Sequence, residues 1–165
     1  MIRLNSFTTA AAVIAAGAAL TACGSMSKGT ATARASLAPT AAITPNPTSG
    51  SATFTALAHG VRVAGEVRGL APGSEHGFHI HEKGDCGNNG NASGGHFNPA
   101  GGMHGKFGGA GTHAGELPSL VADAAGVARF SVDVHSISLT DGAAQLAGGS
   151  SKSIERAVDM RRCQR

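Results

Sequence analysis

The sequence predicts an all-β fold, an antiparallel β-sandwich or barrel, that carries one long loop rich in glycine and histidine. From Ala31 onward, short segments of alternating apolar and polar residues are separated by glycine, proline and other turn residues. That pattern is typical of strands in antiparallel sheets. Residues 84–118 interrupt it with a glycine-rich stretch that has neither helical nor strand periodicity. A loop of that length is either disordered or functional.

The N-terminal segment, residues 1–22, predicts a secretory signal that the mature chain lacks. A basic start is followed by an apolar run that is too short to span a bilayer and ends in small residues. The run closes with "LTAC", ending at Cys23, which resembles the bacterial lipobox, whose cysteine is acylated. We therefore expect an exported, periplasmic lipoprotein that is anchored to a membrane through Cys23. An ordinary signal with an incidental cysteine is the alternative.

After the signal, the chain divides into a tether, one domain and a tail. Residues 23–30 are small and polar and predict a tether. One domain is expected over residues 31–146, and residues 147–165 form a tail of different character. Strand-like segments within the domain are residues 31–37, 51–57, 61–67, 76–82, 119–123, 127–134 and 136–139, with a turn at Ala124-Ala125-Gly126.

Charge and cysteine content narrow the possible partners. The net charge is +3, the basic residues are dispersed, and tryptophan and tyrosine are absent. Nucleic-acid binding is therefore not expected, because it needs a basic face and stacking side chains. If Cys23 carries lipid, Cys86 and Cys163 remain, and in an oxidising compartment such a pair favours a disulfide over a zinc site. The alternative is that Cys163 stays free.

Histidines are concentrated in and before the long loop. Of the eight histidines, six lie between residues 76 and 113: His76, His79, His81, His96, His104 and His113. His79 and His81 project from the same face of an extended chain. Neutral imidazole suits copper and zinc, and a bound ion would order a loop too polar to fold by burial. His59 and His135 stand apart, and we expect them to be solvated surface residues.

These motifs carry a specific resemblance. "HGFHIHE", "GGHFNP", the "HG" at His104 and "THAGELP" resemble the copper/zinc superoxide dismutase family over about residues 31–146. The resemblance implies a Greek-key sandwich or barrel, copper and zinc as cofactors, and superoxide as substrate. It also implies His79, His81 and His96 as copper ligands. His96 would bridge both metals and act in catalysis by passing a proton to bound peroxide. His104, His113 and Glu116 would complete the zinc site, with Glu116 where the family has aspartate. His76 is expected to support the site or the fold.

The tail departs from that family. After His135 there is no histidine. The family, by contrast, continues with a strand that bears a fourth copper histidine, then an arginine beside the copper that guides superoxide to it, and a final cysteine-containing strand. "SIERAVDM" lacks strand alternation, and its composition favours a short helix. We therefore expect the last strands to be missing through frameshift or truncation, so Arg161 and Arg162 are not assigned the guiding role. Three functions follow: an impaired dismutase, a non-catalytic copper or zinc module, or an unstable product.

Overall fold

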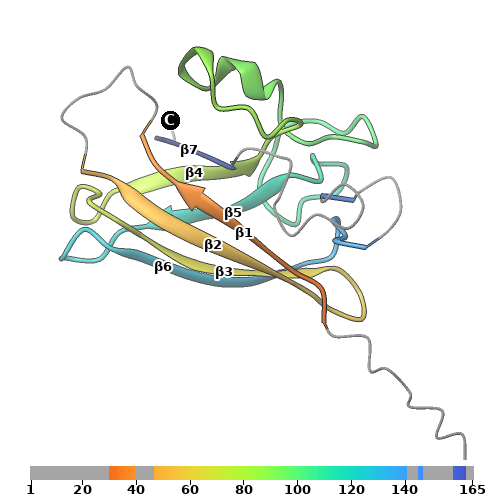
Figure 1. The fold of residues 1–165 in the computed structure, drawn as a ribbon, viewed down its shortest axis with the longest axis horizontal. Coiled ribbons are helices and arrows are strands. Elements are labelled where there is room, and N and C mark those ends of the chain that lie inside the picture. Colours follow the sequence, from red (N-terminus) through yellow and green to blue (C-terminus); the bar gives the residue numbers. More distant parts are fainter. Residues whose placement is uncertain (1–29, 40–46, 141–144, 147–157, 163–165) are drawn as a thin grey trace, which may run out of the picture.

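The computed structural model describes residues 30–39, 47–140, 145–146 and 158–162. Seven strands make two antiparallel sheets that pack as two layers (Figure 1). The first sheet has the order β1-β2-β3-β6, formed by β1 (Thr32–Leu37), β2 (Ser49–Ala56), β3 (Val61–Arg68) and β6 (Ala128–Val134). The second has the order β5-β4-β7, formed by β4 (Glu75–Ile80), β5 (Glu116–Val121) and β7 (Val158–Arg162). The expected all-β sandwich is therefore confirmed, as two sheets rather than a closed barrel among the described residues.

The core lies between the two sheets. On β2, Ala52 and Phe54 are buried with exposed or half-buried neighbours between them, which is the alternation expected of a strand with one face inward. Phe78 of β4 and Phe130 of β6 meet across the layers, with ring centroids 5.0 Å apart at 60°. This edge-to-face pairing is favourable for aromatic rings and helps to hold one sheet on the other.

The chain crosses between the sheets three times, after β3, after β5 and after β6. The second crossing is a tight turn at the expected place, where the Gly126 N–H donates to the Asp123 carbonyl at 3.0 Å. The Asp123 carboxylate also accepts the N–H groups of Ala125 and Val127 at 2.8 and 3.0 Å. Gly126 has φ +74°, a conformation that glycine adopts without steric cost.

The long loop joins β4 to β5, and its segments gather at one end of the sandwich (Figure 1). It contains one short 3₁₀ element, η1 (Asn88–Ser93). Two main-chain bonds connect the loop to the end of β4: Phe97 N–H to Ile80 O at 2.7 Å and Ile80 N–H to Gly115 O at 2.9 Å. A third, Gly115 N–H to Phe97 O at 2.8 Å, joins the two loop residues to each other. The loop is thus fixed to the end of β4 by backbone hydrogen bonds, which satisfy its polar groups.

Two expectations about secondary structure are wrong. Residues 136–139 do not form a strand, although Ser138 forms an isolated β-bridge with Gln145. Within "SIERAVDM", Val158–Met160 belong to β7 and are not helical. β7 pairs with β4, and His79 lies opposite Asp159. Pairing with β4 therefore determines the extended conformation of this segment, although its sequence shows little strand-like alternation. The boundary at residue 147 stays a prediction, because residues 147–157 lie outside the described part.

The predicted signal, tether and lipid-bearing Cys23 also fall outside the described residues. Within the described ranges, none of the helical structure is long and apolar enough to cross a bilayer.

Candidate metal centre

Strand pairing between β4 and β5 brings the first two site residues together. His79 on β4 and Glu116 at the start of β5 are opposite each other in the antiparallel register. Residues opposite each other in an antiparallel pair point to the same face. The His79 Nε2 accordingly lies 3.1 Å from the Glu116 Oε2. Glu116 is only 3% exposed, so its carboxylate needs a cationic or hydrogen-bonding partner there.

His81 and His96 are placed beside this pair by the loop. The two residues form an isolated antiparallel bridge immediately beyond β4, with the rings perpendicular and their centroids 5.1 Å apart. The His96 ring also stacks on that of His79, with centroids 4.0 Å apart and planes 15° from parallel. His96 therefore contacts both His79, on β4, and His81, directly after it.

His104 and His113 approach the same carboxylate and also lie beside His96, with ring centroids 5.2 and 5.5 Å from that of His96. Their Nδ1 atoms lie 2.9 and 3.0 Å from the Glu116 Oε1, and the His96 Nδ1 lies 3.4 Å from it. The His104 side chain is 65% exposed, whereas those of His96 and His113 are 20% and 17% exposed. The cluster is thus open to solvent at His104 and enclosed elsewhere.

The donor set suits a divalent metal ion. Four imidazoles converge on one buried carboxylate, and four of these side chains offer donor atoms within 4.8 Å of one another: His79, His96, His104 and Glu116. Imidazole nitrogen and carboxylate oxygen are the usual ligands of zinc, and imidazole also suits copper. A cation at this position would balance the buried negative charge. The residues present therefore fit copper and zinc.

Burial lowers the pKa of His96, and this effect outweighs the opposing influence of the Glu116 carboxylate. The ring is therefore neutral at neutral pH, with a lone pair available on one nitrogen. A neutral ring is the form that ligates a metal.

The structure thus brings all six predicted ligands, His79, His81, His96, His104, His113 and Glu116, into one cluster. Their division between copper and zinc stays a prediction. The group whose donor atoms lie within 4.8 Å of one another combines His79 of the predicted copper set with His104 and Glu116 of the predicted zinc set, and it also contains His96, which belongs to both sets. Spacing along the chain gave no signal of the His79–Glu116 contact, because it depends on the register between β4 and β5.

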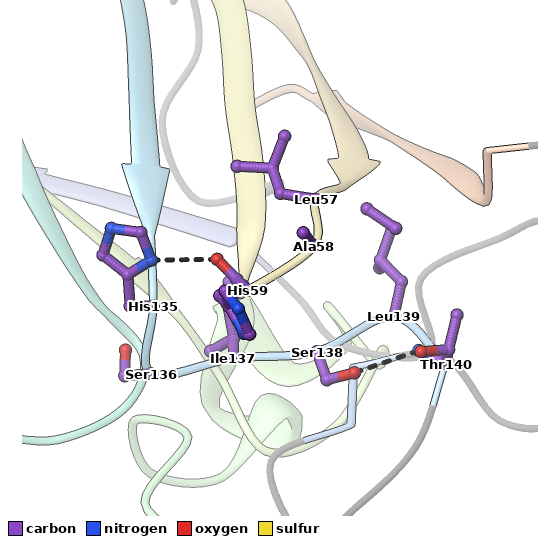
Figure 2. Close-up of a pocket in the computed structure, with 11 residues that line it drawn as sticks. Leu57, Ala58, His59, His135, Ser136, Ile137, Ser138, Leu139 and Thr140 are labelled. Carbon is purple, nitrogen blue, oxygen red and sulfur yellow. Dashed lines mark hydrogen bonds between the residues drawn. The ribbon is translucent and has the colours of Figure 1, made fainter.

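The remaining histidines lie elsewhere. His76 is half-buried on β4, and its Nε2 is 2.7 Å from the Ser74 hydroxyl. His59 and His135 are exposed, as expected, but they are not isolated: the His135 Nδ1–H donates to the His59 carbonyl at 2.9 Å (Figure 2). Both line a surface pocket of about 400 Å³ between the β2–β3 turn and residues 135–140, and none of the residues that line it belongs to the metal-ligand group. Sequence analysis missed this contact.

Cys86 is exposed in the loop. Cys163, its predicted disulfide partner, lies outside the described residues, so the pairing stays a prediction.

Comparison with known proteins gives consistent results. The family model for copper/zinc superoxide dismutase (SODC) matches residues 48–162. An extracellular Cu-Zn superoxide dismutase of Haemonchus contortus is 45% identical over 80 residues, covering 48% of this chain and 43% of the relative. A Cu-Zn superoxide dismutase of Mesembryanthemum crystallinum is 50% identical over 70 residues, covering 42% of this chain and 44% of the relative. The matched region is thus less than half the length of these relatives. The crystal structure of the clock protein EA4 superposes with a TM-score of 0.61 at 35% identity, covering 79% of this chain and 75% of that one.

Proposed function

Because this chain belongs to the copper/zinc superoxide dismutase family, which implies copper and zinc as cofactors, we propose that it dismutates superoxide, with reduced efficiency. Two superoxide ions and two protons would give one dioxygen and one hydrogen peroxide. The observation that carries the proposal is the convergence of four histidines on the buried Glu116 carboxylate. A cluster of this composition has no structural role that apolar packing could not fill at lower desolvation cost.

In this proposal His79, His81 and His96 hold copper, and His96, His104, His113 and Glu116 hold zinc. When bound, copper supplies the one-electron couple and zinc a fixed positive charge. Strand β4 holds His79 in place, and the β-bridge between His81 and His96 positions these two further copper ligands beside it. Ligands placed on rigid strands need less ordering when they bind a metal.

The proposed role of His96 in catalysis is to hold and release a proton at a ring nitrogen. Its pKa is lowered by burial, so the ring is neutral at neutral pH, has a lone pair with which to accept a proton, and releases that proton readily. His79 stacks on this ring at a centroid distance of 4.0 Å and limits its rotation. The exposed edge at His104 leaves a path for a small anion and for water.

Reduced efficiency is proposed because β7, which pairs with the strand that carries His79, has the sequence "VDMRR" and contains no histidine. Three nitrogen ligands would leave a copper position to water or another donor, which changes affinity and redox potential. The same observation favours a second candidate, a non-catalytic module that binds copper or zinc.

The test is superoxide decay, measured by stopped flow after unbound metal has been removed by dialysis. We expect metal-loaded protein to accelerate decay, more slowly than a full-length relative, and His96→Ala to abolish the acceleration. A chimera whose residues 147–165 are replaced by the C-terminal segment of such a relative should regain the rate. A rate equal to the relative's would overturn the proposed impairment, and metal uptake without any acceleration would support the binding module.

We also propose export and membrane anchoring through lipid on Cys23. The basic start, apolar run and "LTAC" support this, and the Haemonchus contortus relative is named extracellular. Disulfide formation between Cys86 and Cys163 belongs to the same proposal, because it requires an oxidising compartment.

A further inference from the structure

The side chain of Ser93 lies against a predicted copper ligand and is almost completely buried. Ser93 and His81 are 3% and 4% exposed. The Ser93 Oγ lies 2.9 Å from the His81 Nδ1 and 2.6 Å from the Gly90 carbonyl oxygen. The Gly94 carbonyl oxygen also lies 2.9 Å from the same Nδ1. One imidazole nitrogen therefore faces two oxygens of the loop.

The directions of these bonds follow from the available protons. A carbonyl oxygen can only accept, so the bond to Gly94 requires a proton on the His81 Nδ1. The Ser93 hydroxyl has one proton and donates it to the Gly90 carbonyl, so toward His81 it acts as an acceptor. Both oxygens therefore favour the same tautomer, in which Nδ1 carries the proton and Nε2 carries the lone pair. The Nε2 atom is a buried side-chain nitrogen.

From this geometry we infer that Ser93 is a positioning residue, which acts together with the Gly94 carbonyl to hold His81 in the Nδ1–H tautomer and so presents Nε2 as the metal-binding nitrogen. The inference rests on the proposed function insofar as that nitrogen binds copper. Partners of this kind fix both the tautomer and the orientation of a ligating imidazole. Ser93 does not contact the metal in this account; it acts through His81.

The same serine connects His81 to a constrained part of the loop. The Gly90 N–H donates to the Cys86 carbonyl at 3.1 Å, so hydrogen bonds run from Cys86 through Gly90 and Ser93 to the ring. Asn88 and Asn89 between them have φ values of 48° and 55°, a region that asparagine tolerates better than most residues. The turn that presents Ser93 is therefore defined by its own backbone as well as by the site.

The experiment uses metal-free protein with ¹⁵N-labelled histidine, and ring nitrogen shifts report the His81 tautomer. In the wild type we expect a protonated Nδ1 and an unprotonated Nε2. Ser93→Ala should add a population with the proton on Nε2 and lower copper(II) affinity by about 10- to 100-fold, the usual effect of losing such a partner. Electron paramagnetic resonance of the copper(II) form should change as well.

Ser74→Ala is the matched control, because it removes the same atom from a serine bonded to a different histidine, His76 on β4. It should leave the His81 shifts and copper affinity unchanged. If Ser93→Ala does not fold, Ser93→Cys, a weaker acceptor of similar size, gives the same measurement. A wild-type His81 protonated on Nε2, or a folded Ser93 variant indistinguishable from Ser74→Ala, would overturn the inference. Failure of the wild type to dismutate superoxide would leave the metal-free ring shifts unaffected, so the two failures are distinguishable.

Discussion

The His79 Nε2 lies 3.1 Å from the Glu116 Oε2, although the long loop separates the two residues in the sequence. The contact follows from their register position, because β4 and β5 pair His79 directly with Glu116. The same carboxylate reaches His96, His104 and His113 through its other oxygen. Glu116 therefore connects the strand that presents His79 with the loop that presents the other histidines, and it should control metal binding.

Substitution of Glu116 by glutamine should strongly weaken zinc binding. Glutamine keeps the size of the side chain but removes the negative charge that a zinc site of three imidazoles uses as its fourth ligand. Loss of a residue that only hydrogen-bonds to a metal ligand lowers metal affinity by about 10- to 100-fold. Because Glu116 is itself a proposed ligand, we expect zinc affinity to fall by roughly 100-fold or more. Competition titration with a chelator measures the change.

The control for this titration is Glu75→Gln, which removes a carboxylate from an exposed position at the start of β4. Glu116→Asp should retain zinc, because it restores the residue that the family has. Equal zinc affinity in wild type and Glu116→Gln would show that the carboxylate is not a ligand.

Gly65→Ala should destabilise the sandwich. A Cβ at Gly65 on β3 would collide with the Ser51 carbonyl oxygen and approach the Phe130 Cζ to 2.8 Å. Phe130 packs edge-on against Phe78 across the core and can move little, so overpacking should cost at least about 1–3 kcal/mol. Thermal or urea unfolding of metal-free protein measures the loss. Gly95→Ala, where the nearest atom is the Glu82 Cδ at 4.0 Å, should have a much smaller effect.

The turn after β5 should make stability depend on pH. Hydrogen bonds from the Val127 and Ala125 backbone, and then the nearby Arg129, lower the pKa of Asp123. The pKa of Asp123 in the folded state lies below its value in the unfolded state. Its contribution to the free energy of unfolding is therefore complete above the unfolded-state pKa and is lost as the pH falls through the folded-state pKa.

Asp123→Asn should therefore be less stable than wild type at neutral pH, and the difference should shrink below about pH 4. Urea unfolding across this pH range measures the stability difference between the two proteins. Metal-free protein is used because acid would otherwise also release a bound metal. A stability difference that stays constant down to pH 2 would contradict the role given to the Asp123 charge.

Processing at Cys23 should be visible by mass spectrometry. We expect protein extracted from membranes of a bacterial host to begin at Cys23 and to carry a lipid adduct there, because the preceding residues match a lipobox. Cys23→Ser should appear without the adduct and outside the membrane fraction, since acylation needs the thiol. Membrane-extracted wild type that carries no lipid on this cysteine would refute the anchoring.

The sequence alone was sufficient to predict strands at the positions of β1 to β6 and the turn between β5 and β6, but not β7. These features depend on local properties: alternating burial along Ala52–Phe54 and its neighbours, and a turn whose glycine adopts φ +74°. The density of histidines likewise indicated a metal centre before any contact was known. Only tertiary structure decided that the Glu116 carboxylate meets His79 as well as the loop histidines. It also decided that Val158–Arg162 pair with β4 as a strand and that His135 bonds to the His59 carbonyl. Each of these depends on the register or packing of segments far apart in the chain, and such pairing is fixed by what both segments bury together.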